Sequence, residues 1–450
     1  MDRVMMREHS PEKRIKDFRE VALGFSEKEA LEEAGRCLLC TKPSCVKGCP
    51  AKVDIPGFIR KLREKHYDRA LDEIKKTNTL PAVCGRVCPA EFQCEKSCIL
   101  SNKGAAIAVQ ALERFAADKG NTARCTGQKG KGSKVAVIGS GPAGVTCAAD
   151  LALKGYDVTI FEALHAPGGV LIYGIPEFRL PNQVVREEIE MVSRLGVSIR
   201  LNQIVGLTVD MKDLLKDHEA VFVGVGAGLP RFLGIDGENL INVITANEFL
   251  TRVNLMKAYR FPEYATPAYK AKRTIVVGGG NVAMDAARCA RRLGSEVVVV
   301  YRRGEEEMPA REVEIEHAKA EGIRFMLLTN PTKVLGDKKV EKVELQRMRL
   351  GEPDSSGRRR PEPIPGSEFL EGCDQFIIAI GTSPNPVLLK KLDVEKTNKG
   401  TIIVDEKQQT SDPRIFAGGD ISSGEATVIQ AIGDGKRAAE GVDDFLDSKK

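Results

Sequence analysis

The sequence has no long apolar run and no strong charge excess, and we expect no leader, features that would otherwise mark several protein classes. No run of apolar residues approaches the roughly 18 that a membrane-spanning helix needs, so we expect no membrane span. The first residues, MDRVMMREHSPEKR, have no apolar core of a signal peptide, so we expect a cytoplasmic location. A net charge of +5 is small for 450 residues and gives no reason to expect nucleic acid as a partner.

The composition, with 42% apolar and 29% charged residues, is that of a soluble globular protein. Its length predicts about two to four domains. In a cytoplasmic protein we do not expect the twelve cysteines to form structural disulfides. Eight of them lie between Cys37 and Cys98, and the spacing within this segment therefore carries the information.

The clustered cysteines form two groups in a segment that we expect to be helical, with helices starting near Ser26 and Asp54 and spanning Ala105–Ala117. The groups are Cys37-x2-Cys40-x4-Cys45-x3-Cys49-Pro50 and Cys84-x3-Cys88-x5-Cys94-x3-Cys98. Zinc ribbons favour two C-x2-C knuckles and only one exists here, whereas a run ending in Cys-Pro is typical of ferredoxins. Eight thiolates match two [4Fe–4S] clusters; zinc, or buried cysteines without a metal, are the alternatives.

A dinucleotide signature begins at Lys134, with the sequence KVAVIGSGPAG. A predicted strand leads into Gly139, Gly141 and Gly144, the G-x-G-x-x-G pattern, and a helix follows. The next strand ends at Glu162, 23 residues after Gly139, where a carboxylate meets a ribose hydroxyl. We expect the glycines, with Pro142 and Ala143, to bind a dinucleotide through the positive end of the helix.

Two Gly-rich segments flank this unit. Gly127 to Lys134 (GQKGKGSK) is predicted to be a linker. Ala166 to Pro181, which contains Gly169, is too rich in Gly and Pro for a regular element. It could cover the cofactor; the alternative is an ordinary surface connection.

A second signature, TIVVGGGNVAMD, begins at Thr274. Gly278, Gly280 and Ala283 form the G-x-G-x-x-A variant, and Asn281 and Val282 lie inside it. After the next strand the chain has Arg302 and Arg303 where an acid would recognise a 2′-hydroxyl, which favours a ribose 2′-phosphate and therefore NADP(H). Arg311 is a weaker candidate, with a solvated helix residue as the alternative; for Arg302 and Arg303 the alternative is a basic surface corner.

The C-terminal part returns to predicted strands at Phe376–Gly381 and Ile402–Val404, after a loop through Arg358 to Arg360. The segment Thr410-x5-Phe416-Ala417-Gly418-Gly419-Asp420 brings a carboxylate to the end of a strand. Together with the two nucleotide units it resembles the flavoprotein pyridine-nucleotide oxidoreductases. In that family the first unit binds FAD, the second NAD(P)H, and the late Asp contacts the ribityl chain, which here assigns Gly419 and Asp420 to FAD.

The cysteine-rich front narrows the resemblance to the glutamate synthase small (β) subunit group. That group also includes the large subunit of NADH-dependent ferredoxin–NADP oxidoreductase and the N-terminal half of dihydropyrimidine dehydrogenase. The motifs are Cys37-Leu-Leu-Cys40, Gly48-Cys49-Pro50, Cys84-Gly-Arg-Val-Cys88-Pro89, Tyr173-Gly-Ile-Pro-Glu-Phe-Arg-Leu-Pro181 and Gly278-Gly-Gly-Asn-Val-Ala-Met-Asp285. The resemblance implies an α/β protein with a helical iron–sulfur domain (1–130), an FAD domain (131–228 and 385–450) and an inserted NADPH domain (229–384).

The resemblance also implies an interleaved ligation of two [4Fe–4S] clusters. One cluster would take Cys37, Cys40, Cys45 and Cys98. The other would take Cys49, Cys88, Cys94 and a non-cysteine side chain at the position of Glu113, so that Cys84 would be a neighbour. The residue count alone assigns all eight cysteines, and an exposed helix residue is the alternative for Glu113.

We expect an enzyme that passes electrons from NADPH through FAD to the clusters and on to a larger protein, with no catalytic acid or base because hydride transfer is direct. The partner would be a glutamate synthase large subunit, and a flavin/iron–sulfur small subunit of a bifurcating complex is the alternative partner. A sulfide dehydrogenase is an alternative function. The chain could also form a homo-oligomer. No C-x-x-C or C-x4-C dithiol lies near either nucleotide unit, and Cys147 and Cys289 are predicted to be core residues. A zinc-stapled, nucleotide-sensing scaffold is the non-enzyme alternative.

Overall fold

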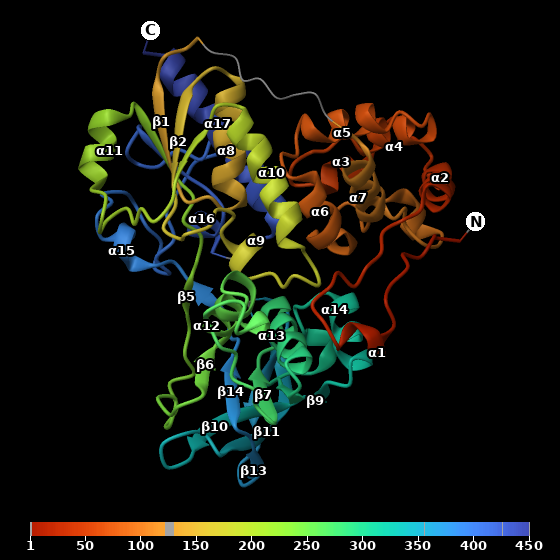
Figure 1. The fold of residues 1–450 in the computed structure, drawn as a ribbon, viewed down its shortest axis with the longest axis vertical. Coiled ribbons are helices and arrows are strands. Elements are labelled where there is room, and N and C mark those ends of the chain that lie inside the picture. Colours follow the sequence, from red (N-terminus) through yellow and green to blue (C-terminus); the bar gives the residue numbers. More distant parts are fainter. Residues whose placement is uncertain (1, 122–129, 355, 425, 450) are drawn as a thin grey trace.

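The computed structural model of the protein describes residues 2–121, 130–354, 356–424 and 426–449. Figure 1 shows three parts: a helical unit beside an upper parallel sheet, and a second parallel sheet below both. In Figure 1, α1 (Pro11–Arg14) lies beside the lower unit, next to α14 (Glu312–Ala320). The helical unit contains α2 (Glu27–Arg36), α3 (Ser44–Gly48), α4 (Ile55–Arg63), α5 (Tyr67–Lys75), α6 (Pro81–Val87), η1 (Ala90–Phe92), η2 (Ile99–Asn102) and α7 (Val109–Lys119). Ser26 begins α2 in a complete capping box with Glu29, and Asp54 caps α4, as the sequence predicts.

The upper sheet is parallel, with strand order β16-β4-β1-β2-β3. Its strands are β1 (Lys134–Ile138), β2 (Asp157–Phe161), β3 (Ser198–Arg200), β4 (Ala220–Val223) and β16 (Ile415–Ala417). The associated helices are α8 (Pro142–Leu153), α9 (Val170–Tyr173), α10 (Asn182–Arg194), α11 (Met211–Asp217), α15 (Pro386–Leu389), α16 (Asp420–Ser423) and α17 (Val428–Asp447). Helices on both faces explain why β1 and β4 read as continuous apolar runs, since both faces are buried.

The lower sheet is also parallel, with order β6-β14-β7-β8-β9. Its elements are β6 (Val243–Thr245), α12 (Ala246–Leu250), η3 (Thr251–Leu255), η4 (Ala258–Arg260), β7 (Arg273–Val277), α13 (Asn281–Arg292), β8 (Glu296–Val300), η5 (Glu305–Glu307), α14 (Glu312–Ala320), β9 (Arg324–Met326) and β14 (Gln375–Ile378). An antiparallel sheet joins it, built from β10 (Thr329–Leu335), β11 (Lys342–Pro353), β12 (Arg359–Pro363) and β13 (Phe369–Gly372).

The lower sheet is inserted into the chain of the upper one. The chain leaves the upper sheet after β4 and returns to it only at β16, so the predicted α/β fold with an inserted nucleotide unit is confirmed. The two crossings lie side by side, because β5 (Leu229–Pro230) pairs with β15 (Thr382–Ser383). The boundaries predicted at 130, 228 and 384 stay predictions, although this paired crossing lies beside the last two.

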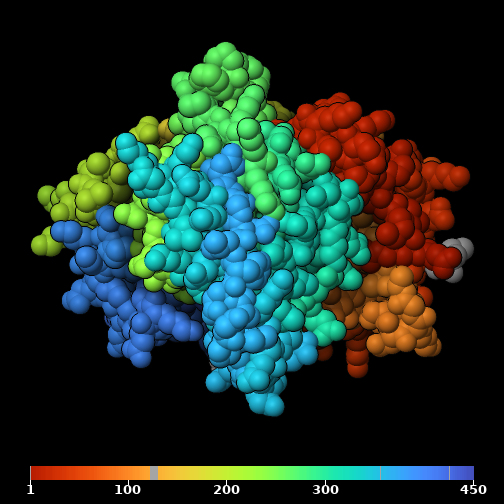
Figure 2. Space-filling view, turned by 90° about the horizontal axis from the view of Figure 1, so that it is seen from below, coloured from red at the N-terminus to blue at the C-terminus, as the bar shows by residue number. Residues whose placement is uncertain are grey.

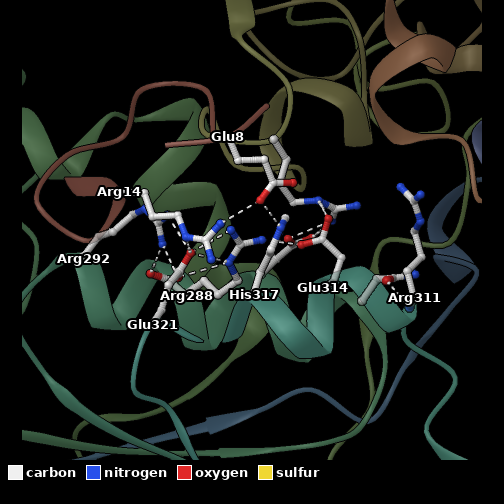
Figure 3. Close-up of polar contacts among 11 residues, drawn as sticks. Glu8, Arg14, Arg288, Arg292, Arg311, Glu314, His317 and Glu321 are labelled. Atoms are coloured by element: carbon white, nitrogen blue, oxygen red, sulfur yellow. Dashed lines mark hydrogen bonds and ion pairs between the residues drawn. The ribbon is translucent and has the colours of Figure 1, made fainter. Parts of the chain in front are cut away.

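The N-terminal segment binds the lower sheet through a buried ion-pair cluster with α13 and α14 (Figure 3). The Glu321 carboxylate faces three arginines: Arg14 at 3.2 Å, Arg288 at 2.8 Å and Arg292 at 2.7 Å. Figure 2 shows the N-terminal segment, in red, covering one flank of this unit. The helical unit and the inserted unit are therefore held together by charge as well as by packing.

Two predicted elements are wrong. Ile402–Val404 is not a strand; within the described residues Ile402 makes only an isolated bridge with Lys396. The predicted loop through Arg358 to Arg360 instead becomes β12, which starts at Arg359 because β11 continues to Pro353 and offers it a pairing edge. Residues 127–129 of the predicted linker lie outside the described residues.

No helix in the described part of the chain is long and apolar enough to cross a membrane.

Candidate functional site

The loop between β1 and α8 shows why its three glycines differ. Gly139 has a φ of +96°, and a Cβ atom on it would lie 2.6 Å from the carbonyl oxygen of Gly224. A Cβ on Gly144 would lie 2.0 Å from the carbonyl oxygen of Gly139, so this glycine lets the helix pack against the loop. A Cβ on Gly141 would meet no atom within 4 Å, because Gly141 faces open space. That space is where the backbone can approach a ligand phosphate.

The open space is a cavity of about 410 Å³ beneath this loop. The structure places most of the first group of predicted residues along its wall: Gly139, Gly141, Pro142, Ala143, Glu162, Gly169, Gly419 and Asp420. Gly144 is behind the wall, where it packs against Gly139. Residues almost 300 positions apart in the chain thus share one cavity, because β16 lies in the same sheet as β1 and β2.

Glu162 is held in place by the loop that it faces. Its carboxylate accepts hydrogen bonds from the backbone N–H of Ser140 at 2.9 Å and of Leu164 at 2.8 Å, and from the Ser140 hydroxyl. Ser140 is fully buried, and its hydroxyl oxygen also accepts from the Gly168 N–H at 2.9 Å. Ser140 therefore orients both the acid and the Gly168–Gly169 turn. Ser140 was not predicted from the sequence, although a small polar residue between the first two glycines was a usable signal.

Asp420 begins α16 directly after Gly419, which has a φ of +78°. Its Oδ1 accepts from the backbone N–H of Ala426 at 2.8 Å. The Gly419 N–H donates to Asp434 of α17 at 2.8 Å. Asp434 was also missed; it lies in a helix whose sequence pattern does not distinguish a buried carboxylate from a surface one.

The predicted cluster ligands separate into two sets by burial. Cys37, Cys40, Cys45 and Cys98 are half-buried, whereas Cys49, Cys84, Cys88 and Cys94 are buried. Burial raises the pKa of the Cys45 thiol to about 11, and the negative charges of Cys98, Cys37 and Cys40 raise it further. Burial likewise raises the pKa of Cys88, with contributions from Cys84, Glu113 and Cys49. The half-buried set holds the four residues assigned to one cluster, and the buried set holds the three cysteines assigned to the other together with Cys84; the ligand assignment stays a prediction.

Both disputed positions, Glu113 and Cys84, face the buried set. Glu113 is 8% exposed, and burial raises its pKa to about 7 although Asn78 donates a 2.7 Å hydrogen bond to it. The Cys84 Sγ lies 3.8 Å from the Oδ1 of the same Asn78. Buried thiols beside a buried carboxyl are a donor set that suits an iron–sulfur cluster. Among the described residues, no three His, Cys, Asp or Glu side chains converge as they would on a single metal ion.

A hydrogen-bond bridge joins the buried cysteine set to the cavity. The Gln93 side chain accepts from the Cys88 thiol at 3.3 Å and donates to the Thr427 hydroxyl at 3.2 Å. Thr427 caps α17 and lines the cavity. Pro50, which follows Cys49, also lies against α17, since a Cβ on Gly433 would be 2.9 Å from the Pro50 carbonyl oxygen. The buried cysteine set and the cavity therefore share one wall.

The second glycine loop, between β7 and α13, repeats the geometry of the first. Gly278 has a φ of +143°, and its Cβ would lie 2.2 Å from the Ala379 carbonyl oxygen. Gly280 has only Pro309 near its Cβ, at 3.9 Å. Val282 is exposed and Ala283 is fully buried, so one side of the helix start is open and the other is packed. Asn281 accepts from the backbone N–H of Arg311 at 3.0 Å.

The three candidate arginines have different surroundings. Arg303 is buried and pairs with Asp354 at 2.6 Å. Arg311 is buried and pairs with Glu91 of the helical unit at 2.6 Å. Arg302 is exposed and makes no ion pair in the described residues, and burial together with the charges of Arg303 and Arg358 lowers its pKa. Of the three, Arg302 has the guanidinium that is available for a phosphate.

The chain matches two family models. Residues 133–435 match the pyridine nucleotide-disulphide oxidoreductase family, and residues 14–125 match the dihydropyrimidine dehydrogenase domain II, 4Fe-4S cluster. A relative named NADP(+)-dependent formate dehydrogenase subunit beta, from Moorella thermoacetica, is 41% identical over 89% of this chain and 60% of its own length. The glutamate synthase [NADPH] small chain of Escherichia coli is 38% identical, with 98% of each chain covered.

One more curated relative and a solved structure resemble this chain. The NADPH-Fe(3+) oxidoreductase subunit beta of Geobacter sulfurreducens is 38% identical over 90% of this chain, which spans 64% of that relative. Among solved structures, Mycobacterium tuberculosis FprA in complex with NADPH matches with a TM-score of 0.60 and 22% identity, covering 71% of this chain and 85% of that one, a likeness of fold. The chain belongs to the pyridine nucleotide-disulphide oxidoreductase family, in the group that contains the glutamate synthase small chains and carries a 4Fe-4S domain.

Proposed function

We propose that this oxidoreductase takes electrons from NADPH onto FAD and passes them through two [4Fe–4S] clusters to a larger protein. The bridge Cys88–Gln93–Thr427 is the observation that carries the proposal, because it joins the cysteine set to the cavity under the first glycine loop. When bound, FAD accepts an electron pair from NADPH and releases single electrons, which iron–sulfur clusters carry one at a time. The remaining work of the chain is binding and positioning.

The FAD site would be the cavity beneath the β1–α8 loop. The backbone of Gly141 and the N-terminus of α8 would hold the pyrophosphate, and Glu162, fixed by Ser140, would accept from the ribose. Asp420 at the opposite wall would contact the ribityl chain. NADPH would lie on the β7–α13 loop, at Gly280 and Asn281, with Arg302 on the 2′-phosphate.

The buried cysteine set would receive electrons first. Cys49, Cys88, Cys94 and either Glu113 or Cys84 would hold this cluster, and the half-buried Cys37, Cys40, Cys45 and Cys98 would hold the second. The partner that accepts the electrons would be a glutamate synthase large chain. The reason is that the Escherichia coli glutamate synthase small chain matches this chain over 98% of both lengths. The Moorella and Geobacter relatives are longer proteins, so a different partner is the second candidate. Genes beside the one that encodes this chain would separate the two.

Metal and flavin analysis of anaerobically purified protein tests the proposal. We expect about eight iron atoms, as many acid-labile sulfides and about one FAD per chain. NADPH should bleach the flavin absorbance in an anaerobic titration. Zinc without iron, or no flavin, would contradict the proposed function; about four iron atoms would contradict only the second cluster.

Changing Arg302 to glutamine is expected to weaken NADPH binding by about 10- to 100-fold and to leave NADH binding unchanged. The reason is that a guanidinium with no competing ion pair contributes a charge-assisted contact only to the 2′-phosphate. Flavin bleaching titrated with both nucleotides measures the two affinities. Arg194→Gln, an exposed arginine at the end of α10, is the matched control. An equal loss for NADH and NADPH would refute a 2′-phosphate contact.

The fourth ligand of the buried cluster can be decided by a pair of variants. If Glu113 is the ligand, Glu113→Ala should alter the EPR spectrum and lower the iron content, whereas Cys84→Ala should leave both unchanged. Both side chains are buried beside Asn78, so loss of packing affects both variants and the spectrum distinguishes them. The reverse pattern would make Cys84 the ligand. Unaltered spectra in both variants would exclude both side chains.

A further inference from the structure

Two exposed apolar side chains lie directly beside the half-buried cysteines. Leu38, between Cys37 and Cys40, is 61% exposed, and Ile99, which follows Cys98, is 53% exposed. Leu39, which lies between Leu38 and Cys40, is half-buried and has a left-handed backbone conformation with a φ of +47°. Large apolar residues this exposed, at thiols that are themselves partly accessible, suit a surface that another protein covers.

The two segments that carry these residues are basic and contain no acid. Between residues 37 and 53, and again between 96 and 104, the chain has no Asp or Glu. These two segments contain five exposed lysines: Lys42, Lys47, Lys52, Lys96 and Lys103. None of the five forms an ion pair within the part of the chain that the structure describes. Two acids flank the segments: Glu95 is buried and pairs with Arg3 at 2.7 Å, and Asp54 is exposed and caps α4 by accepting from the Gly57 N–H.

The two segments form one continuous face. The Ser44 hydroxyl donates to the Ser97 carbonyl oxygen at 2.5 Å. A Cβ atom on Gly48 would lie 2.4 Å from the Ser97 Oγ, so the two segments also pack closely there. We call residues 37–53 and 96–104 the lysine face. It carries the exposed apolar residues Leu38 and Ile99 together with five exposed lysines, a combination of apolar and charged side chains that suits a protein-docking site.

We propose that the lysine face is where electrons leave the protein, and that its occupant is an electron-accepting protein with an acidic rim. This inference rests on the proposed function, since it assigns the half-buried cysteine set to the exit. The other thiol set is buried beside the cavity, and only the first set reaches the surface. Lysines without acidic partners attract an acidic face at long range and favour it over neutral or basic ones.

The test uses a bacterial flavodoxin, an acidic one-electron acceptor, as the protein probe. We compare the native protein with the quadruple variant Lys42→Gln, Lys47→Gln, Lys96→Gln and Lys103→Gln. At low ionic strength, the variant should reduce flavodoxin at least about tenfold more slowly and bind oxidised flavodoxin correspondingly more weakly in calorimetry. The native rate should fall as salt is added, and the variant should lose most of this dependence. Hexaammineruthenium(III), a small cation, should react no more slowly with the variant.

The matched control removes four exposed lysines elsewhere: Lys216→Gln, Lys338→Gln, Lys390→Gln and Lys399→Gln. Because the net charge changes equally, the control should keep the native rate with flavodoxin. A separate pair, Leu38→Gln with Ile99→Gln, should slow the reaction at every salt concentration, since apolar contacts are not screened.

Equal effects of the two quadruple variants, no effect of the first, or no salt-dependent reaction of the native protein would each overturn the lysine face. Iron content and flavin bleaching by NADPH are measured on the same samples. If those two fail, the proposed function fails. If they hold while the variants behave alike, only this inference fails.

Discussion

Replacing Glu321 with glutamine is expected to lower the stability of the protein by about 3–5 kcal/mol, the range for removing one partner from a buried ion pair. For a unit of 150–250 residues this is a fall in the melting temperature of roughly 6–20 °C, since 1 kcal/mol corresponds to about 2–4 °C. Differential scanning calorimetry measures it.

The size of the effect follows from the three arginines that share this carboxylate. Arg288 and Arg292 both donate to Glu321, and Arg14 from the N-terminal segment lies 3.2 Å away (Figure 3). Arg288 is fully buried and Arg292 nearly so, and both guanidiniums lie over the Phe178 ring. Arg288 also pairs with Glu314 and Arg14 with Glu8, but an amide cannot replace the negative charge that Glu321 supplies to all three arginines. The variant should therefore also loosen the N-terminal segment, which limited proteolysis would detect.

Glu316→Gln is the control, because Glu316 is exposed on α14 and its removal should change stability by less than about 0.5 kcal/mol.

The dependence of stability on pH has a definite sign. Burial opposes ionisation of Glu321, but Arg288 and Arg292 outweigh it, so its pKa lies below the usual value. Its contribution is therefore present above the pKa of an unfolded glutamate and is lost as pH falls through the lower folded pKa. A Glu321→Gln protein with native stability would contradict the importance of this cluster.

The ion-pair cluster also shows what could not be predicted from the sequence. Arg14, Arg288 and Glu321 lie in three separate, highly charged segments, and each resembles an ordinary surface residue in its own segment. The partner of each is fixed only when α13 and α14 meet the N-terminal segment. By contrast, the parallel sheets follow from continuous apolar strands next to glycine loops, which is local information.

The residues of the candidate site also divide into those that local sequence predicts and those that it does not. The glycine loops, Glu162 and Asp420 could be located because each motif combines a strand end with a required residue type. Ser140, Gln93 and Asp434 could not, since hydrogen bonds with distant partners select them. The sequence predicted that the Arg311 guanidinium lies near the nucleotide loop. It did not predict that Arg311 pairs with the Glu91 carboxylate of the helical unit.

The largest functional effect is expected at the first glycine loop, from Gly144→Ala. The added Cβ would lie 2.0 Å from the Gly139 carbonyl oxygen, a backbone atom that cannot move without displacing the loop. We expect a stability loss of about 3 kcal/mol, the upper range for overpacking, and purified protein that is almost free of FAD. NADPH would then produce no flavin bleaching and no reduction of the clusters.

Gly141→Ala separates binding from folding. Its Cβ would meet no protein atom within 4 Å and would project into the cavity, where the pyrophosphate is proposed to lie. The fold should keep its melting temperature in the absence of FAD, while FAD affinity falls about 10- to 100-fold, or roughly 1.4–2.8 kcal/mol. Gly35→Ala, which also meets no atom within 4 Å but lies in α2, controls for the added methyl group. Flavin content and calorimetry of the three apoproteins decide the matter: native FAD affinity in Gly141→Ala would place the cofactor elsewhere, and native stability in Gly144→Ala would mean that the loop can shift to admit a side chain.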